Sequence, residues 1–227
     1  DPSNSPNPLD QWILSRLNQV IEETTRGLDA YELDRACKGF LDFTDDLSTW
    51  YLRRSRDRFK GEDEADRAFA QATTWYVLRT YSKVLAPFMP FLADHVWSRV
   101  RKGGDQSSVH LELWPHSGSV NTELLESMQL VRDNVSRGLE ARVRLGIKVR
   151  QPLGRVSIKL PLIDDKPLVL APLLLEIIAD ELNIKEVVVD QNLTEDIMID
   201  ATITPELQQE GDFREFMRQI QSERKNL

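Results

Sequence analysis

Residues 31–60 read YELDRACKGFLDFTDDLSTWYLRRSRDRFK, and this stretch carries a long, regular helical pattern. The positions that recur at spacings of three and four residues are Leu33, Ala36, Cys37, Phe40, Leu41, Thr44, Leu47 and Tyr51. This period predicts one amphipathic helix from about Tyr31 to Phe59, ending before Gly61. A helix with a single apolar face must bury that face against other elements.

The sequence on either side supplies helices that meet this need. The same period predicts a first helix from Leu9 to about Arg26, where Gly27 ends it, a third from about Glu64 to Leu85, and a fourth from about Phe91 to Arg101. Short turns between the helices favour an antiparallel, up-and-down bundle over residues 9–116. The alternating segment Ser108–Trp114 is expected to run extended across this bundle and close it.

A different pattern follows the bundle. A fifth helix is expected from about Thr122 to Arg144, so that residues 117–149 form a connecting helix and linker. Residues 150–227 then show strand, helix, strand, strand and helix patterns, which predict a small α+β module. Residues 1–8 are rich in Pro, Ser and Asn and are expected to be a linker. The predicted fold class is mainly α, an antiparallel helical bundle followed by a small α+β domain.

Composition excludes several classes of protein. The 227 residues include 29 basic and 37 acidic side chains, and the net charge of −8 argues against nucleic-acid binding through overall charge. No run of about 18 apolar residues predicts a membrane span. The single cysteine, Cys37, and three scattered histidines give neither a disulfide nor a zinc-binding spacing, which favours a soluble protein of the reducing cytoplasm. Because the sequence begins without an initiator Met, we expect a fragment of a longer protein.

The sequence contains none of the common catalytic or nucleotide-binding motifs. The patterns G-x-G-x-x-G, G-x-x-x-x-G-K-[ST] and H-E-x-x-H do not occur. Asp45 and Asp46 are adjacent, so on a helix their carboxylates point about 100° apart and cannot share a proton. We expect both to pair with the arginines that follow. The sequence therefore predicts no active site and no cofactor or metal of its own.

Positive charge is concentrated in two segments. Residues 50–60 hold five basic and one acidic side chain, and residues 137–155 hold six basic and one acidic. Such clusters suit local contacts with phosphate groups, although helix faces crossed by ion pairs have similar counts.

A helical wheel separates the basic residues of the first segment. Arg54 and Arg58 fall near the buried face, where we expect them to pair with carboxylates such as Asp57 or those of a neighbouring helix. Trp50 lies on the flank, where it either stacks an unpaired RNA base or packs into a groove between helices. The residues expected to face solvent together, as candidates for RNA binding with Trp50, are Thr49, Arg53, Arg56 and Lys60.

The second basic segment contains Lys148 and Arg150, between the expected helix stop at Gly146 and Pro152. Two roles are open for this pair. The side chains either brace the junction between the domains against nearby carboxylates or reach the backbone of a bound RNA.

Several motifs resemble one family of tRNA-charging enzymes. Residues 47–59, LSTWYLRRSRDRF, and residues 85–93, LAPFMPFLA, resemble segments of the isoleucyl-tRNA synthetases, and the second is shared with the valyl and leucyl enzymes of class Ia. Residues 108–115, SVHLELWP, follow in the order found in that family. Residues 146–153, GIKVRQPL, resemble the isoleucyl enzymes alone. The resemblance covers roughly residues 9–224.

The resemblance implies an anticodon-binding domain and a C-terminal region, without the catalytic and editing domains. The expected partner is the isoleucine-accepting tRNA, held by Thr49, Trp50, Arg53, Arg56, Lys60, Lys148 and Arg150. ATP and Mg are expected only in the catalytic domain of the parent, which would be a monomeric cytoplasmic isoleucine-tRNA ligase, and this fragment is expected to be inactive alone. Two alternatives stay open: the equivalent region of a valyl- or leucyl-tRNA synthetase, and a helical protein-interaction module that binds no RNA.

Overall fold

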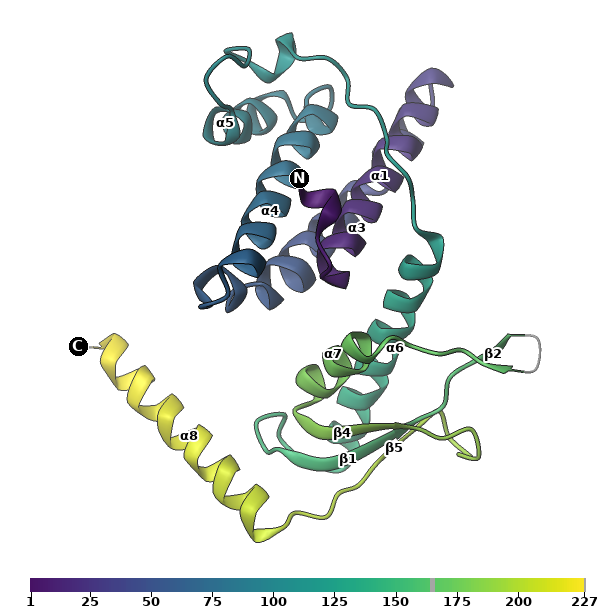
Figure 1. Ribbon diagram of the computed structural model, residues 1–227, viewed down its shortest axis with the longest axis vertical. Coiled ribbons are helices and arrows are strands. Elements are labelled where there is room, and N and C mark those ends of the chain that lie inside the picture. Colours follow the sequence, from purple (N-terminus) through teal and green to yellow (C-terminus); the bar gives the residue numbers. More distant parts are fainter. Residues whose placement is uncertain (164–165, 227) are drawn as a thin grey trace. The chain divides into compact units, whose positions relative to one another are not determined.

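The computed structural model describes residues 1–163 and 166–226 and divides the chain into two compact units, Asp1–Leu125 and Glu126–Leu227 (Figure 1). The division lies inside helix α6 (Thr122–Arg144), whereas the sequence predicted a connecting segment over residues 117–149. All five tryptophans and all four tyrosines belong to the first unit. The predicted fold class is confirmed, because a helical unit precedes a small unit of mixed helix and strand.

The first unit is a bundle in which α1 packs on α2 and α4, and α4 packs on α5. Large side chains fill its core, among them Trp12, Phe43, Tyr51 and Trp97, each at most 2% exposed. Its α-helices are α1 (Pro8–Asp29), α2 (Leu33–Ala36), α3 (Phe40–Asp45), α4 (Glu64–Leu85) and α5 (Pro90–Val100). Shorter elements are the π-helical segment Asp46–Leu52 and the 3-10 turns Pro2–Asn4, Arg58–Lys60 and Val109–Leu111.

The predicted continuous helix from Tyr31 to Phe59 is wrong. The structure divides this stretch into α2, a turn over residues 37–39, α3, the π-helical segment, two α-helical residues at 53–54, a turn over residues 55–57 and a final 3-10 turn. A π-helix places more residues in each turn than an α-helix. In this segment Asp46, Leu47 and Tyr51 are all turned into the core.

Gly27 does not end the first helix, as the sequence predicted, because α1 continues to Asp29. A Cβ atom at this position would lie 2.7 Å from the Cα atom of Ala36, closer than real Cβ contacts allow. The glycine therefore permits the close approach of α1 and α2.

Residues 1–8 are packed and do not form the linker that we expected. Asp1 caps the 3-10 turn Pro2–Asn4, and the Ser5 side chain is 1% exposed. The Ser5 hydroxyl donates to Asp10 at 2.6 Å, which ties the segment to the first turn of α1. The hydrogen bond explains why a Pro- and Ser-rich sequence is ordered here.

The segment Ser108–Trp114 contains a 3-10 turn, and no residue of this described segment is in a strand. Asp94 on α5 accepts hydrogen bonds from the Ser108 hydroxyl at 2.6 Å and from the Val109 N–H at 3.0 Å. The indole N–H of Trp114 donates to Thr25 at 2.9 Å. The segment thus crosses from α5 to α1 on side-chain contacts rather than on strand pairing.

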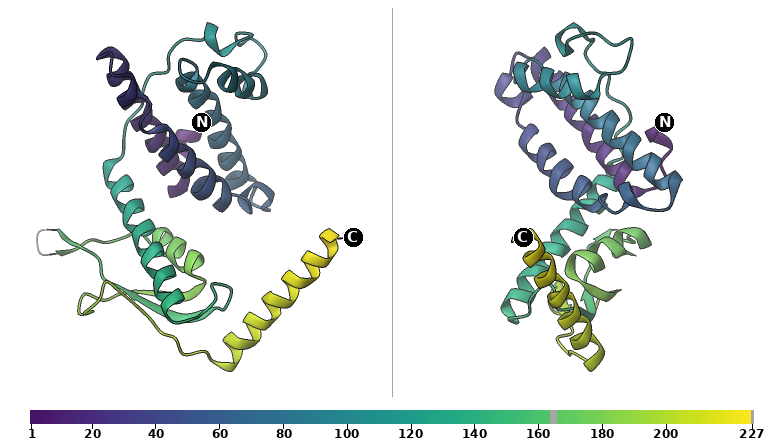
Figure 2. Two further views of the ribbon diagram at one scale, coloured as in Figure 1. Left: turned by 180° about the vertical axis from the view of Figure 1, so that it is seen from behind. Right: turned by 90° about the vertical axis from the view of Figure 1, so that its left-hand side faces the viewer.

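The second unit is built on a three-stranded sheet in the order β4-β1-β5. The central strand β1 (Leu153–Ile158) pairs parallel with β4 (Ile184–Val189) and antiparallel with β5 (Ile197–Ile199). Helix α7 (Pro172–Leu182) connects β1 to β4, and Figures 1 and 2 show α6 and α7 on the same face of the sheet. The remaining elements are the paired strands β2 (Leu162–Ile163) and β3 (Lys166–Pro167) and the C-terminal helix α8 (Pro205–Asn226).

Candidate nucleic-acid interface

The basic stripe, defined here as Thr49, Trp50, Arg53, Arg56 and Lys60, runs from the π-helical segment to the end of the 3-10 turn. Four of its side chains are exposed, and Trp50 is half-buried. The exposure predicted from the helical wheel is therefore found, even though the continuous helix is not.

Local hydrogen bonds shape the backbone beneath the stripe. The Thr49 hydroxyl donates to the Asp45 carbonyl at 2.7 Å, and Arg53 Nε donates to the Thr49 carbonyl at 2.7 Å. Isolated π-helical turns occur often at functional sites. The π-helical segment is thus a feature that the sequence pattern did not reveal and that lies where Thr49 and Trp50 are presented.

A buried carboxylate anchors this region from below. Asp10 is fully buried and accepts two hydrogen bonds from Arg58, at 2.9 and 2.8 Å, and one from the Tyr51 hydroxyl at 2.7 Å. Arg58 also binds Asp66 on α4 at 2.7 Å. The prediction that Arg58 pairs with a neighbouring helix is confirmed, and its partners are Asp10 and Asp66.

The electrostatics of this network agree with its geometry. Burial opposes the charge of Arg58, but the hydrogen bonds to Asp10 and Asp66 outweigh burial and raise the pKa of the guanidinium. Arg58 in turn lowers the pKa of Asp66 through its hydrogen bond. Burial, together with the charge of Asp10, raises the pKa of Tyr51 well above its usual value, so the phenol stays protonated and donates.

The neighbouring carboxylate Asp46 is also directed into the core. Its side chain is 3% exposed and accepts from Arg16 Nε on α1 at 2.8 Å. The sequence predicted pairing with the arginines that follow Asp46 and missed this partner, because the two residues are 30 positions apart.

A cluster of cations and indoles on α4 and α5 was not predicted. The guanidinium of Arg79 lies 5.2 Å from the ring centre of Trp75 and 4.5 Å from that of Trp97. Arg79 also donates to Asp105 at 2.7 Å, which fixes the loop after α5. Such stacking stabilises the bundle, and the ring of Trp97 is fully buried in it.

The second basic segment forms a tight loop after α6. Lys148 and Arg150 are both exposed, and Arg150 lies 3.4 Å from Glu215 on α8. Both partners belong to the second unit. The ion pair therefore braces this loop against α8.

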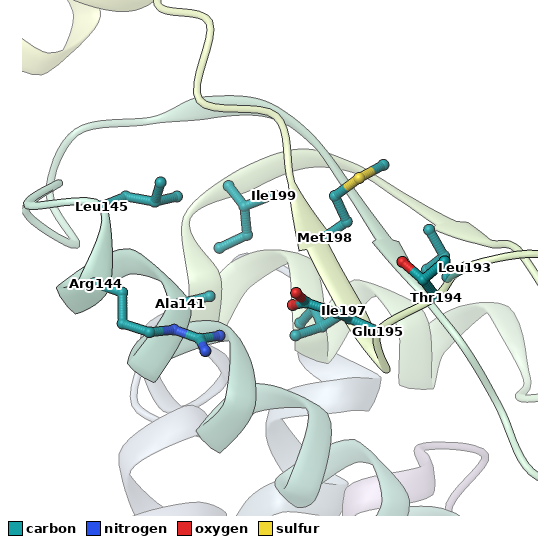
Figure 3. A pocket seen from close by; sticks show the side chains of 9 residues that line it. All are labelled: Ala141, Arg144, Leu145, Leu193, Thr194, Glu195, Ile197, Met198 and Ile199. Atoms are coloured by element: carbon teal, nitrogen blue, oxygen red, sulfur yellow. The ribbon is translucent and has the colours of Figure 1, made fainter.

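The second unit also has a shallow pocket of about 300 Å³. Figure 3 shows Ala141 and Arg144 of α6, with Leu145 directly after it, on one side of the pocket and residues of 193–199 on the other. Its lining is mostly apolar. Among the described residues no group of three or more His, Cys, Asp or Glu side chains is placed to hold a metal ion. No helix in residues 1–163 and 166–226 is long and apolar enough to cross a membrane.

Comparison with known proteins gives a consistent family. The model of the anticodon-binding domain of tRNA ligase matches residues 10–159. An isoleucine-tRNA ligase from Treponema denticola is 37% identical over 185 residues, covering 80% of this chain and 17% of the relative. The corresponding ligases from Chlamydia trachomatis and Streptomyces coelicolor are 41% and 40% identical over 165 and 190 residues, covering 70% and 81% of this chain.

This chain spans only 16% to 17% of the length of these three curated relatives. The matched residues 10–159 include the bundle from the first turn of α1 onward, the basic stripe and the loop that carries Lys148 and Arg150. On this match, the chain belongs to the family of anticodon-binding domains of tRNA ligases.

Proposed function

We propose that this chain binds the anticodon arm of an isoleucine-accepting tRNA, as one region of an isoleucine-tRNA ligase. The observation that carries the proposal is the exposed basic stripe inside residues 10–159, the part of the chain that matches the anticodon-binding family. The choice of isoleucine is supported by the names of the relatives.

The chemistry of the stripe suits single-stranded RNA. Arg53, Arg56 and Lys60 offer exposed cations for phosphate groups, and Trp50 offers part of an indole for stacking. Unpaired bases of an anticodon loop are held by aromatic and guanidinium planes together with phosphate contacts. The chain as a whole carries a net charge of −8. The acidic surface outside the stripe therefore repels nucleic acid, and this repulsion limits contact there.

The scaffold beneath the stripe is rigid where the proposal requires it. Tyr51 and Arg58 alternate with stripe residues along the chain and point inward to Asp10. Because these inward side chains are fixed, the backbone that carries the intervening residues is held in place, and those residues face outward. Preorganised contacts lose less entropy when a ligand binds.

The ligation reaction belongs, in this proposal, to the rest of such a ligase. ATP with Mg²⁺ would be used by a catalytic domain outside this chain, so the chain alone would not attach isoleucine to tRNA. The parent would act in the cytoplasm as a monomer.

A titration with three tRNAs tests the proposal. Transcribed isoleucine, valine and leucine tRNAs are titrated against the chain by fluorescence anisotropy at about 50 and 150 mM KCl. We expect the isoleucine tRNA to bind most tightly. Equal affinity for all three tRNAs would contradict the isoleucine assignment. Tighter binding of the valine or leucine tRNA would assign the chain to the valyl or leucyl enzymes instead. No binding at the lower salt would favour a protein-interaction module.

Two substitutions connect that binding to the stripe. Arg53→Ala and Arg56→Ala should each weaken binding and lower the magnitude of the salt slope by about 0.7 for each phosphate group that the protein no longer neutralises. Arg99→Ala, at an exposed arginine on α5, is the matched control and should bind as the parent does. Stripe variants that match the parent would place the RNA elsewhere.

A further inference from the structure

The loop of residues 145–151 is organised around a buried arginine. Arg142 has no exposed surface, and its guanidinium donates to the carbonyls of Leu182 at 3.0 Å and Lys148 at 2.7 Å, and to that of Gln151. It also lies 3.4 Å from the carbonyl of Val149. Burial lowers the pKa of Arg142, and within the described residues no carboxylate pairs with it. A buried cation thus holds backbone carbonyls of this loop on its inner side.

A second side chain completes this arrangement. Asn183, which ends α7 in the left-handed conformation with φ of 50°, donates from Nδ2 to the carbonyls of Val149 at 2.9 Å and Arg150 at 3.0 Å. Gly146 adopts φ of 68°, which lets the chain turn sharply after α6. The carbonyls of residues 148–151 therefore all have partners on the inner side.

This fixed orientation leaves hydrogen-bond donors on the outside. In a planar trans peptide the carbonyl and the following N–H point in opposite directions. The N–H groups of Val149 and Arg150 therefore point away from Arg142, and they donate to no acceptor in residues 1–163 and 166–226. Successive outward N–H groups of a turn form a site that attracts anions.

Cationic side chains lie at the same turn. Lys148 and Arg150 are exposed there, and Arg218 on α8 shares the Glu215 carboxylate with Arg150. The carboxylate of Glu215 receives hydrogen bonds from Arg218 at 2.7 and 3.1 Å and lies 3.4 Å from Arg150. The hydrogen bond from Arg218, with the charges of Arg150 and Lys148, lowers the pKa of Glu215. A negatively charged group therefore already bridges two of these cations, Arg150 and Arg218, while the N–H groups of Val149 and Arg150 have no acceptor among the described residues.

We propose that Lys148, Arg150 and Arg218, with the N–H groups of Val149 and Arg150, bind a phosphodiester of the RNA backbone, and that the Glu215 carboxylate holds Arg150 and Arg218 while RNA is absent. The RNA identity of the ligand rests on the proposed function. The phosphate takes the place of Glu215 at Arg150 and Arg218 and also accepts from the N–H groups of Val149 and Arg150, so binding exchanges one anion for another at the two arginines. Arg142 is a positioning residue in this site, because its guanidinium binds backbone carbonyls of the loop and of Leu182 and does not reach the ligand.

The exchange predicts that one substitution should strengthen RNA binding. Glu215→Gln should tighten binding of the transcribed isoleucine tRNA by about two- to fivefold at low salt, the range expected for one exposed ion pair. Glu223→Gln changes the same charge on the same helix at an exposed residue and should leave the affinity unchanged. The double variant Lys148→Ala with Arg150→Ala should weaken binding on the order of tenfold and reduce the salt slope.

A short RNA separates this site from the bundle. In ¹H–¹⁵N spectra, a trinucleotide of uridine should shift the amides of Val149 and Arg150 in the Glu215→Gln variant and leave them unmoved in the double variant. Amide shifts without tRNA binding would retain the site and reject the proposed function. The opposite result is tight tRNA binding by both Glu215→Gln and Glu223→Gln with equal affinity, while the amides of Val149 and Arg150 stay unmoved. That result would reject the site and retain the proposed function.

Discussion

Each unit of the molecule buries an arginine, and the two are stabilised in different ways. Arg58 in the first unit, with 12% of its side chain exposed, is bound by the carboxylates of Asp10 and Asp66. Arg142 in the second unit is fully buried and bound only by backbone carbonyls within the described residues. The pKa of Arg58 is raised by its carboxylate hydrogen bonds despite burial, whereas burial lowers the pKa of Arg142.

The comparison separates two uses of a guanidinium. At Arg58 the charge itself is matched, so the site joins α1, α4 and the 3-10 turn through ion pairs. At Arg142 the donors of the two terminal nitrogens matter more than charge neutralisation, since they satisfy carbonyls that a loop would otherwise leave buried and unpaired, whereas the buried Nε has no partner among the described residues. Removal of Arg58 should therefore destabilise the first unit by leaving carboxylates without a cation, and removal of Arg142 should destabilise the second unit by leaving carbonyls without donors.

Arg58→Ala should have the largest effect. The substitution leaves Asp10 buried beside Tyr51 without its cation, at a cost of about 3 to 5 kcal/mol in the free energy of unfolding. Urea denaturation followed by tryptophan fluorescence measures this effect in the first unit, which holds every tryptophan. A loss below about 1 kcal/mol would mean that Asp10 is protonated or solvated and that the ion pair is not the anchor.

Arg142→Leu should have the next largest effect and should lower the free energy of unfolding of the second unit by about 2 to 4 kcal/mol. The reason is that buried carbonyls of the loop and of Leu182 lose their donors. The loss should appear as faster amide hydrogen exchange in β1 and α7. The urea midpoint of the tryptophan fluorescence transition, which follows the first unit, should not change. Arg144→Leu, two residues along α6 and exposed, is the control. Equal exchange rates in the two variants would remove the distinction between charge and donor geometry.

Acid should weaken the first arginine site through its carboxylates. The pKa of Asp66 is lower in the folded protein than in the unfolded chain, so its stabilisation is complete above the unfolded pKa near 3.9 and disappears as pH falls through the folded pKa. Asp66→Asn should therefore reduce the melting temperature at pH 7, and parent and variant should converge at low pH. A constant difference across the titration would show that Asp66 contributes by packing.

Arg56→Ala should have the smallest effect on stability. Arg56 is exposed and lies only two residues from Arg58, so the free energy of unfolding should change by less than about 0.5 kcal/mol. The same urea titration measures it. A loss comparable with that of Arg58→Ala would show that neighbours in the stripe share the buried network.

Periodicity alone predicted part of the fold accurately. The expected bounds of the third and fifth helices coincide with α4 and α6, because both are long, continuous stripes with clear ends. The second helix was mispredicted because an apolar pattern of α-helical spacing does not reveal a π-helical segment, in which apolar residues such as Leu47 and Tyr51 remain buried. Alternation at Ser108–Trp114 was also misleading, since strand formation needs a partner that the local sequence does not specify.

The sequence predicted the exposed residues of the candidate site, but it did not predict the buried hydrogen-bond network beneath them. Exposure of Arg53, Arg56 and Lys60 follows from their place opposite the apolar face. Asp10 gave little local signal, because an acidic residue in the first turn of a helix normally interacts with the helix dipole in solvent. Its partners Tyr51 and Arg58 are 41 and 48 residues away, so only the tertiary fold brings them together.

The three-residue strand β5 lies at the edge of the sheet and is bracketed by Asp196 and Asp200. A free edge of apolar residues is a template on which a second copy of a chain can extend the sheet into an aggregate. Here the flanking carboxylates limit the apolar run to Ile197–Ile199, and a second copy would bring like charges together at both ends. Replacement of both aspartates by valine would lengthen that run, and we expect precipitation at high concentration in addition to the loss of the Arg137–Asp196 ion pair and of the hydrogen bond from the Thr202 N–H to Asp200.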